Sequence, residues 1–394
     1  MSHRIPDLLK MCVDVGGSDL HFKLDTGKVY VRKFGDLEEL TAELPFTGAE
    51  FKEDLYALLR EDQIEKYERE LELDFSFEIE GVSRFRGNAY QQRGHTQAAF
   101  RVIPYEIQTM QELQVPKACY DFVERPRGLV LVTGPAGSGK STTQASMIDH
   151  INRTQNVHIV TVEDPIEFVH DDQKALINQR EVDQDTLSFA NALKYVLRQD
   201  PDVILVGEMR DLETIHLAIT AAETGHLVFG TLHTVDSIQT VDRIVDVFPT
   251  HQQQQVRMQL SVNLLGVVAQ ALVKRADGRG RVAAYEVLVA TGAVRNLVRE
   301  NKSYQLGSIL QTGVRHGMQT LDMSLAMLTE RGLVTHEDAK AKSKDPAEFD
   351  RLVELAREAS RKRAASEDAP PKQSSQNVAQ GVRGQPNRPA FKRD

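Results

Sequence analysis

The segment GPAGSGKSTT constrains this chain more than any other part of its sequence. It follows the apolar run RGLVLVT and fits the pattern G-x-x-x-x-G-K-[ST], with a strand predicted before it and a helix after it. Glycines let backbone N–H groups turn around a phosphate, and the amino end of a helix adds partial positive charge. We therefore predict a nucleotide phosphate site in which Lys140 reaches the β- and γ-phosphates and the Ser141 hydroxyl binds Mg²⁺. The predicted binding residues are Gly134, Pro135, Ala136, Gly137, Ser138, Gly139, Lys140, Ser141 and Thr142.

Short apolar runs alternate with helical stretches after Arg127. The runs LVLVT, HIVTV, VILVG and LVFGTL are typical of strands, and helices are predicted near residues 140–152, 188–199 and 211–223. This alternation predicts an α/β fold with a mainly parallel sheet that is buried on both faces. The longest apolar helix candidate, Asn263–Val273, is too short to cross a bilayer, and we predict a buried core helix there.

Sequence patterns divide the chain into five parts, and its length favours two or three domains. Residues 1–103 mix β-type runs (DFSFEIEG, SRFRGNAY, AAFRVIP) with an acidic helical stretch, which predicts a small α/β domain. Prolines punctuate residues 104–126, which we interpret as a linker with a lead-in helix. Residues 127–290 carry the phosphate loop, and residues 291–365 show helical spacing. Residues 366–394 are rich in Pro, Gln, Ser and Gly, which predicts a disordered tail.

Charge and cysteine content narrow the class of protein. The 394 residues include 48 Lys or Arg and 57 Asp or Glu, a net charge of −9, which argues against a protein that coats nucleic acid. Cys12 and Cys119 can form neither a four-cysteine zinc site nor a disulfide framework, which favours a reducing compartment. The chain lacks a signal-like start and any stretch of roughly 18 apolar residues. We therefore expect a cytoplasmic protein.

Two predicted strands end in carboxylates that suit chemistry at a phosphate site. Glu208 follows VILVG, while Glu163 and Asp164 follow HIVTV. A carboxylate at the carboxyl edge of a parallel sheet can orient an attacking water or hold the hydration shell of a metal. Glu208 is our first choice for polarising the water and for binding Mg²⁺, partly through water. Glu163 is the second choice, and the roles of the two residues are exchangeable. For either residue, the alternative is a solvated carboxylate at a strand end without a catalytic role.

Two histidines flank the apolar run LVFGTL. His226 precedes it, and we expect this side chain only to brace the loop. His233 lies just past the other end, where a role in sensing the γ-phosphate and a purely structural role are both open.

Four ordered motifs resemble one known family. GPAGSGKST, VEDPIEF, ILVGEMRDLETI and TGHLVFGTLHT look like the Walker A, Asp box, Walker B and His box of secretion ATPases, in the PilT-like branch that powers type IV pilus retraction. The resemblance runs from GGSDLHF to about residue 345. It implies a hexamer of two-domain subunits, each with an amino-terminal PAS-like domain and a RecA-like P-loop ATPase that hydrolyses ATP with Mg²⁺.

The resemblance also implies further site residues and partners. Arginines of the amino-terminal domain complete the nucleotide site in this family, and Arg86 and Arg101 match that pattern, with Arg93 a weaker third. Surface charge on a β-hairpin is the alternative for them. The implied partners are an inner-membrane pilus platform protein and a paralogous retraction ATPase, with no nucleic acid. The chain would then lie in the cytoplasm, peripheral to the inner membrane.

Two features favour retraction over pilus assembly. Assembly and type II secretion ATPases usually carry a tetracysteine zinc module, which two lone cysteines cannot build. AVRNLVRE resembles the AIRNL motif of PilT-like proteins, and it also fits an amphipathic helix whose Val294, Leu297 and Val298 pack inward. Three alternatives remain: an assembly or secretion ATPase, a regulator that binds nucleotide without hydrolysing it, and a motor acting on nucleic acid.

The sequence departs from the family pattern in two places. The segment after Phe22 lacks the usual G-x-P-P turn, so we expect a remodelled edge of the first domain. The basic tail has no counterpart in the family, and we favour a solvated tail over contact with anionic lipid or a partner.

Overall fold

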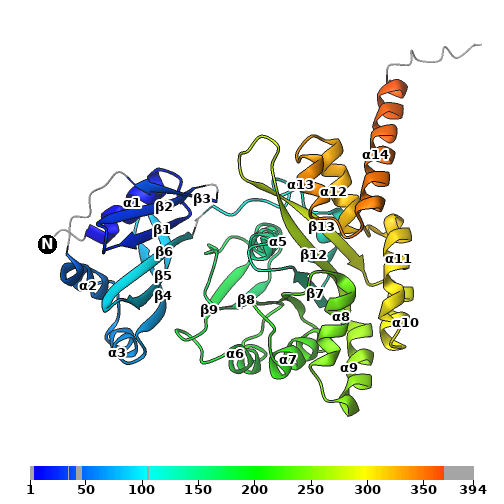
Figure 1. The fold of residues 1–394 in the computed structure, drawn as a ribbon. Coiled ribbons are helices and arrows are strands. Elements are labelled where there is room, and N and C mark those ends of the chain that lie inside the picture. Colours follow the sequence, from blue (N-terminus) through cyan, green and yellow to red (C-terminus); the bar gives the residue numbers. More distant parts are fainter. Residues whose placement is uncertain (1–3, 34, 41–46, 104–105, 368–394) are drawn as a thin grey trace, which may run out of the picture.

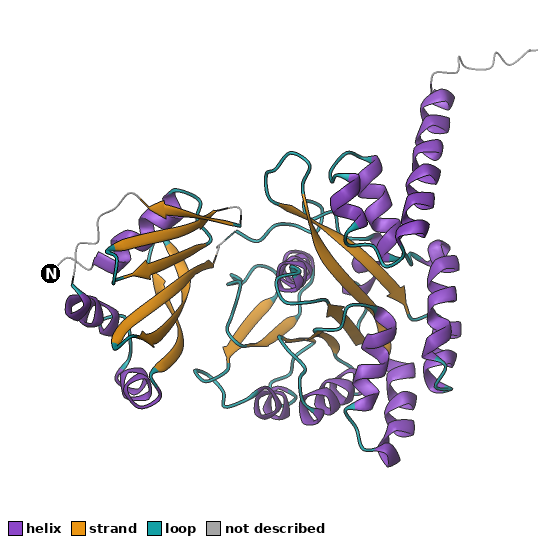
Figure 2. Cartoon of the chain, viewed as in Figure 1, coloured by secondary structure: helices purple, strands orange, loops and turns teal. Residues whose placement is uncertain are grey.

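The structure is a computed structural model that describes residues 4–33, 35–40, 47–103 and 106–367. The chain forms two lobes, each built on its own sheet, and further helices pack beside the second sheet (Figure 1, Figure 2). We call them the amino-terminal lobe, up to Ile103, and the phosphate-loop lobe, from Glu106 onward. The predicted α/β fold class is confirmed.

The amino-terminal lobe contains a six-stranded antiparallel sheet in the order β3-β2-β1-β6-β5-β4. Phe51, Leu55 and Tyr67 of its helices pack with Leu20 and Phe100 of the sheet in one core. Along β5, buried and partly exposed residues alternate, as expected for a sheet with one covered face. The elements are α1 (Arg4–Asp14), β1 (Asp19–Lys23), β2 (Lys28–Lys33), β3 (Asp36–Leu40), α2 (Gly48–Tyr56), α3 (Glu61–Glu70), β4 (Glu72–Ile79), β5 (Ser83–Gln92) and β6 (His95–Ile103).

The phosphate-loop lobe contains a seven-stranded sheet in the order β13-β12-β7-β11-β10-β8-β9. The strands from β12 to β9 run parallel, and β13 is antiparallel to β12. Every residue of β7, β10 and β11 is buried, because helices cover both faces. The elements are α4 (Lys117–Val123), β7 (Gly128–Thr133), α5 (Lys140–Thr154), β8 (His158–Glu163), β9 (Leu176–Glu181), α6 (Phe189–Val196), β10 (Val203–Val206), α7 (Leu212–Glu223), β11 (Leu227–Leu232), α8 (Ser237–Asp246), α9 (Thr250–Asn263), β12 (Leu264–Lys274) and β13 (Arg281–Val289).

The helix predicted for Asn263–Val273 is wrong, because this run forms strand β12. A continuous apolar run fits a buried strand as well as a buried helix, and periodicity alone does not separate the two. Here β12 pairs with β7 on one side and with β13 on the other, so its backbone groups are satisfied in the sheet. The carboxyl ends of β7, β8, β10 and β11 share one sheet edge, where the site lies.

Helices follow the second sheet, as the spacing after residue 291 predicts. In α10, Val294 and Val298 are buried and Leu297 packs against the core, which confirms the amphipathic helix. The last helix reaches Glu367, two residues past the predicted boundary, and the rest of the predicted disordered tail lies outside the described residues. The elements are α10 (Gly292–Arg299), η1 (Ser303–Gln305), α11 (Leu306–Thr312), η2 (Gly313–His316), α12 (Leu321–Glu330), α13 (His336–Lys340) and α14 (Pro346–Glu367).

The structure also describes three further features that the sequence analysis singled out. The segment after Phe22 forms the hairpin of β1 and β2, which continues into β3 at the edge of the first sheet. Cys12 and Cys119 are both buried and unbonded. Among the described residues, no helix combines the length and the apolar character needed to span a membrane.

Candidate functional site

The phosphate loop joins β7 to α5, as its sequence predicts. Gly134 has a φ of +143°, and a Cβ at this residue would lie 2.5 Å from the Gln270 carbonyl oxygen and 2.6 Å from Ser138 Oγ. Gly139, with a φ of +86°, is the N-cap residue just before α5. Glycine is therefore required at both positions. On β12, Gln270 Nε2 donates to the Ser138 carbonyl at 2.7 Å and supports the loop from behind.

Lys140 is held inside this loop. Its ammonium donates to the carbonyl oxygens of Gly134 at 2.9 Å and Pro135 at 3.1 Å, and the residue is only 8% exposed. Burial lowers the pKa of Lys140, and the acidic groups Glu167 and Glu208 oppose that shift. The ammonium thus lies at the loop's centre, where a phosphate group would replace weak backbone acceptors with charged oxygens.

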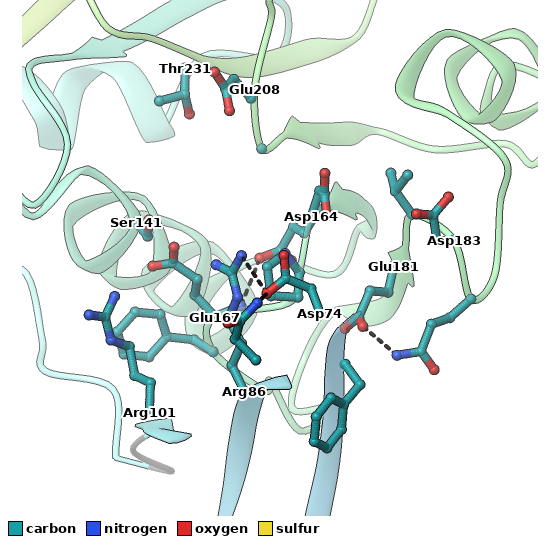
Figure 3. Close-up of a pocket in the computed structure, with 18 of the residues that line it drawn as sticks. Asp74, Arg86, Arg101, Ser141, Asp164, Glu167, Glu181, Asp183, Glu208 and Thr231 are labelled. Carbon is teal, nitrogen blue, oxygen red and sulfur yellow. Dashed lines mark hydrogen bonds and ion pairs between the residues drawn. The ribbon is translucent and has the colours of Figure 1, made fainter. Parts of the chain in front are cut away.

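A cavity of about 920 Å³ lies between the two lobes and includes this loop (Figure 3). From the phosphate-loop lobe it is lined by part of the loop and by the strand ends of β8, β10 and β11. From the amino-terminal lobe it is lined by charged side chains of α3, β4, β5 and β6. The predicted site residues that line it are Ala136, Gly137, Gly139, Lys140, Ser141, Thr142, Glu163, Asp164, Glu208, His233, Arg86 and Arg101.

Glu208 lies just past β10, at the predicted strand end. Its carboxylate accepts hydrogen bonds from Arg210 Nε and, at 2.8 Å, from His233 Nε2. The bond from Arg210 to Glu208 raises the pKa of the guanidinium. His233 is thus brought to Glu208, whereas His226 lies at the opposite end of β11, where its ring contacts the Ala221 carbonyl at 2.9 Å and braces the turn.

Glu163 ends β8 on the same edge, and its carboxylate is bound by neutral donors. Thr161 Oγ1 donates to it at 2.7 Å, Gln179 Nε2 at 3.2 Å and the Glu167 backbone N–H at 3.4 Å. Burial outweighs these bonds and raises the pKa of Glu163 to about 7. Desolvation, together with Asp183, also raises the pKa of the neighbouring Asp164. Glu163 is therefore a carboxyl group that changes charge near neutral pH.

Arg86 on β5 and Arg101 on β6 are direct cross-strand partners. Arg86 Nη2 lies 3.9 Å from Asp74 Oδ1, and Arg101 Nε donates to Asp19 Oδ1 at 2.8 Å. Like charges placed directly opposite each other destabilise a sheet, and here each guanidinium has a carboxylate of its own lobe beside it. Both guanidiniums line the cavity, whereas Arg93 lies in the turn that joins the two strands and does not line it.

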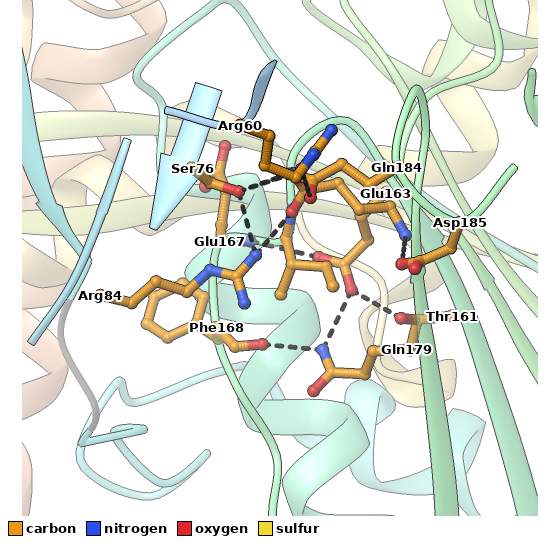
Figure 4. A network of polar contacts seen from close by, with 12 residues as sticks. Arg60, Ser76, Arg84, Thr161, Glu163, Glu167, Phe168, Gln179, Gln184 and Asp185 are labelled. Carbon is orange, nitrogen blue, oxygen red and sulfur yellow. Dashed lines mark hydrogen bonds and ion pairs between the residues drawn. The ribbon is translucent and has the colours of Figure 1, made fainter. Parts of the chain in front are cut away.

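Sequence reasoning missed two sets of polar residues. Arg210, inside the motif GEMRD, binds Glu208 and lines the cavity. Arg84 of the amino-terminal lobe forms an ion pair with Glu181, the last residue of β9, at 2.7 Å. Arg84 is labelled in Figure 4 and Glu181 in Figure 3. Arg210 is only two residues from Glu208, so this contact could have been predicted from the sequence. Arg84 and Glu181 are far apart in the sequence and belong to no recognised motif.

The oxygen donors of the site suit magnesium. In the part of the chain that the structure describes, no cluster of three or more His, Cys, Asp or Glu side chains could hold a metal by itself. Mg²⁺ prefers oxygen ligands and typically binds one or two protein groups together with substrate phosphates and waters. The Ser141 hydroxyl and the Glu208 carboxylate both line the cavity and supply such oxygens.

Comparisons with known proteins agree with this geometry. Residues 92–341 match the family described as Type II/IV secretion system protein. The type IV pilus retraction ATPase PilT of Pseudomonas aeruginosa is 50% identical over 345 residues, which cover 88% of this chain and 99% of PilT. A twitching motility protein of Neisseria gonorrhoeae is 54% identical over 316 residues, 80% of this chain and 84% of its own. A crystal structure of the pilus retraction motor PilT with bound ADP superposes with a TM-score of 0.80 at 47% identity, covering 88% of this chain and 98% of that one.

Proposed function

The chain belongs to the Type II/IV secretion system protein family, in its PilT-like group, and from this premise we propose that it is the ATP-hydrolysing motor of type IV pilus retraction. ATP and water would yield ADP and phosphate, and domain movement would be the mechanical output. The observation that carries the proposal is the cavity between the lobes. It combines a phosphate loop on one wall with two arginines on the other.

The phosphate-loop lobe would bind ATP. Residues Gly134–Thr142 form the cradle, and Lys140 would leave the Gly134 and Pro135 carbonyls to bind the β- and γ-phosphates. Ser141 and Glu208 would hold Mg²⁺, Glu208 partly through water. When bound, the ion neutralises charge on the phosphate oxygens.

Electrostatics favour Glu163 as the general base, the reverse of our first choice from sequence. A general base acts best when its pKa is close to the working pH, and burial raises the pKa of Glu163 to about 7. Glu208 already binds Arg210 and His233, which suits a group that holds a metal's water and reports on the γ-phosphate through His233. Glu163 would accept the proton of the attacking water.

The arginines would stabilise the transferring phosphoryl group. Their cross-strand repulsion is relieved best by an anion placed between them, so a triphosphate favours an arrangement in which Arg86 and Arg101 turn from Asp74 and Asp19 to the ligand. A ligand that binds one arrangement more tightly shifts the population towards it. ATP would therefore close the lobes, and product release would reopen them.

The assembly and its partners belong to the same proposal. We divide the chain into a PAS-like domain (1–103), a linker (104–126), a RecA-like core (127–290), a helical domain (291–365) and a tail (366–394). Six such subunits would form a ring in the cytoplasm, peripheral to the inner membrane. The ring would act on a pilus platform protein and work beside a paralogous retraction ATPase.

Pilus imaging in cells tests this function. In a strain deleted for the gene, labelled pili should persist without retracting, and the parental gene should restore retraction. A gene carrying Lys140→Ala should fail to restore it although the protein accumulates to the same level. Cells without pili in the deletion strain would instead identify an assembly motor and overturn the proposal.

A further inference from the structure

Glu181 lies where the two lobes touch. Its side chain is 5% exposed, and its carboxylate accepts hydrogen bonds from two residues of the amino-terminal lobe, Arg84 Nη2 and Ser76 Oγ, each at 2.7 Å. Gln184, next to it, donates to Ser76 Oγ at 2.9 Å and accepts from Arg60 Nη1 at 3.0 Å. Arg60, just before α3, and side chains of β4 and β5 thus converge on the end of β9 and the turn that follows it in the other lobe (Figure 4).

The same carboxylate also holds the loop that follows Glu163. Strands β8 and β9 are parallel, and Glu163 and Glu181 are register partners at their ends. Glu181 accepts the backbone N–H of Ile166 at 3.2 Å, and Glu163 accepts the backbone N–H of Glu167 at 3.4 Å. Two neighbouring carboxylates therefore bind consecutive N–H groups of one loop, and one of them is also bound by the other lobe.

Arg84 connects this contact to the arginines at the cavity. Arg84 and Arg86 are two positions apart on β5, so they lie on the same face of the strand, separated by about 7 Å along it. An ion pair that fixes Arg84 consequently limits where Arg86 can lie. Glu181 therefore contacts both a residue of the strand that carries Arg86 and the loop beside Glu163.

We propose that Glu181 is a positioning residue of the ATPase reaction, which couples the closure of the amino-terminal lobe to the geometry of the Glu163 loop. The inference rests on the proposed function. When the lobe moves, Arg84 moves the Glu181 carboxylate, and Glu181 moves the N–H of Ile166. Arg86 and Glu163 then reach their working positions together rather than independently. Glu181 itself does not touch the phosphates in this mechanism.

The test compares steady-state kinetics with Mg·ATP for parental protein, Glu181→Gln, Arg84→Gln and the double variant. The amide keeps an acceptor for Ile166 but loses the ionic bond to Arg84, so kcat should fall about tenfold. KM for ATP and the affinity for ADP should stay within about threefold, because the phosphate loop is untouched. Since the two residues act as one unit, the double variant should be no slower than the slower single variant.

Two further variants separate positioning from simple structural support. Arg84→Lys keeps the charge and one hydrogen bond, so it should recover most of the parental kcat. Arg4→Gln removes two ion pairs within the amino-terminal lobe, those of Arg4 with Glu50 and with Asp54, and should leave kcat and KM unchanged. If Glu181→Gln does not fold, Ser76→Ala and Arg84→Gln test the same contact from the other lobe, with Ser76→Ala expected to lower kcat about two- to threefold.

A distance measurement gives a readout of coupling itself. Spin labels at the exposed residues Glu65 and Arg198, one in each lobe, should report a single distance between the lobes that changes when nucleotide binds. Dilution with unlabelled protein restricts the measurement to pairs within one subunit. In Glu181→Gln the distribution should broaden. An unchanged kcat, a multiplicative double variant, or an equal loss of ADP affinity and thermal stability would overturn the inference. Parental protein that does not hydrolyse ATP would instead overturn the proposed function, so the two failures are distinct.

Discussion

The two walls of the cavity differ in how far they are prepared for a ligand. On the phosphate-loop wall, buried strands and obligatory glycines fix the cradle, and Lys140 already lies at its centre. On the opposite wall, Arg86 and Arg101 are bound to carboxylates of their own lobe, and Arg101 has a side chain that is 67% exposed. The phosphate-loop wall is already arranged for a ligand, whereas the arginines of the opposite wall must leave their carboxylates to bind one. This difference suggests that affinity comes from the first wall and turnover from the second.

The largest expected effect comes from a substitution in the phosphate-loop wall, which is already arranged for a ligand. Lys140→Ala removes the ammonium that the cradle holds for the phosphates, so kcat/KM for ATP should fall about a thousandfold, with a matching loss of ATP affinity. Phosphate release and calorimetric titration of ATP measure the two quantities. Lys117→Ala, at the start of α4 and away from the cavity lining, is the control. Parental kinetics in Lys140→Ala would mean that the site assignment is wrong.

Removing an arginine from the opposite wall should give a smaller and different effect. Arg86→Ala should lower kcat about a hundredfold and leave ADP affinity within about threefold, because the charge acts mainly in the transition state. Steady-state kinetics and ADP titration measure the split. Arg69→Ala, an exposed arginine on α3, controls for loss of charge from the same lobe. Equal losses in kcat and ADP affinity would remove the contrast between the walls.

The pH dependence tests which carboxylate serves as the base. Because the raised pKa of Glu163 is about 7, kcat/KM should fall about tenfold for each pH unit below that value as the carboxylate gains a proton. Glu163→Gln should be slow at every pH and should lack this bend. The folded carboxyl also keeps its proton between its ordinary value of 4.5 and about 7 while the unfolded one loses it. Parental stability should therefore decrease as pH rises through that window. A parental profile without a bend near pH 7 would return the role to Glu208.

The smallest expected effect comes from removing the carboxylate beside Arg86, which sharpens the comparison of the two walls. Asp74 is largely exposed and lies 3.9 Å from Arg86, so their attraction is weak. Asp74→Asn should raise the apparent affinity for ATP about twofold, since Arg86 then has less to give up on closure. Competition between ATP and a fluorescent nucleotide measures the shift. A lowered affinity would show that Asp74 itself contacts the nucleotide or its metal.

Local motifs explain why much of the site could be predicted from the sequence. The phosphate loop, Glu163, Glu208 and His233 each lie within a few residues of an apolar strand, and parallel strands bring their carboxyl ends to one edge. The strand β12 could not be predicted, because its apolar run suits a helix equally well. The pair Arg84–Glu181 could not be predicted either, since its partners are 97 positions apart.

Strand β12 also has a consequence for how the molecule carries load. It hydrogen-bonds to β7, which leads into the nucleotide cradle, and to β13, against which α12 packs through a core shared with α14. Gln270 adds a side-chain bond from the same strand to the loop. The carboxy-terminal helices therefore pack on β13 through side chains, and from β13 one continuous ladder of backbone hydrogen bonds runs through β12 to β7, beside the cradle. Such a ladder resists shear, so a force applied to those helices would be transmitted to the nucleotide site with little deformation in between.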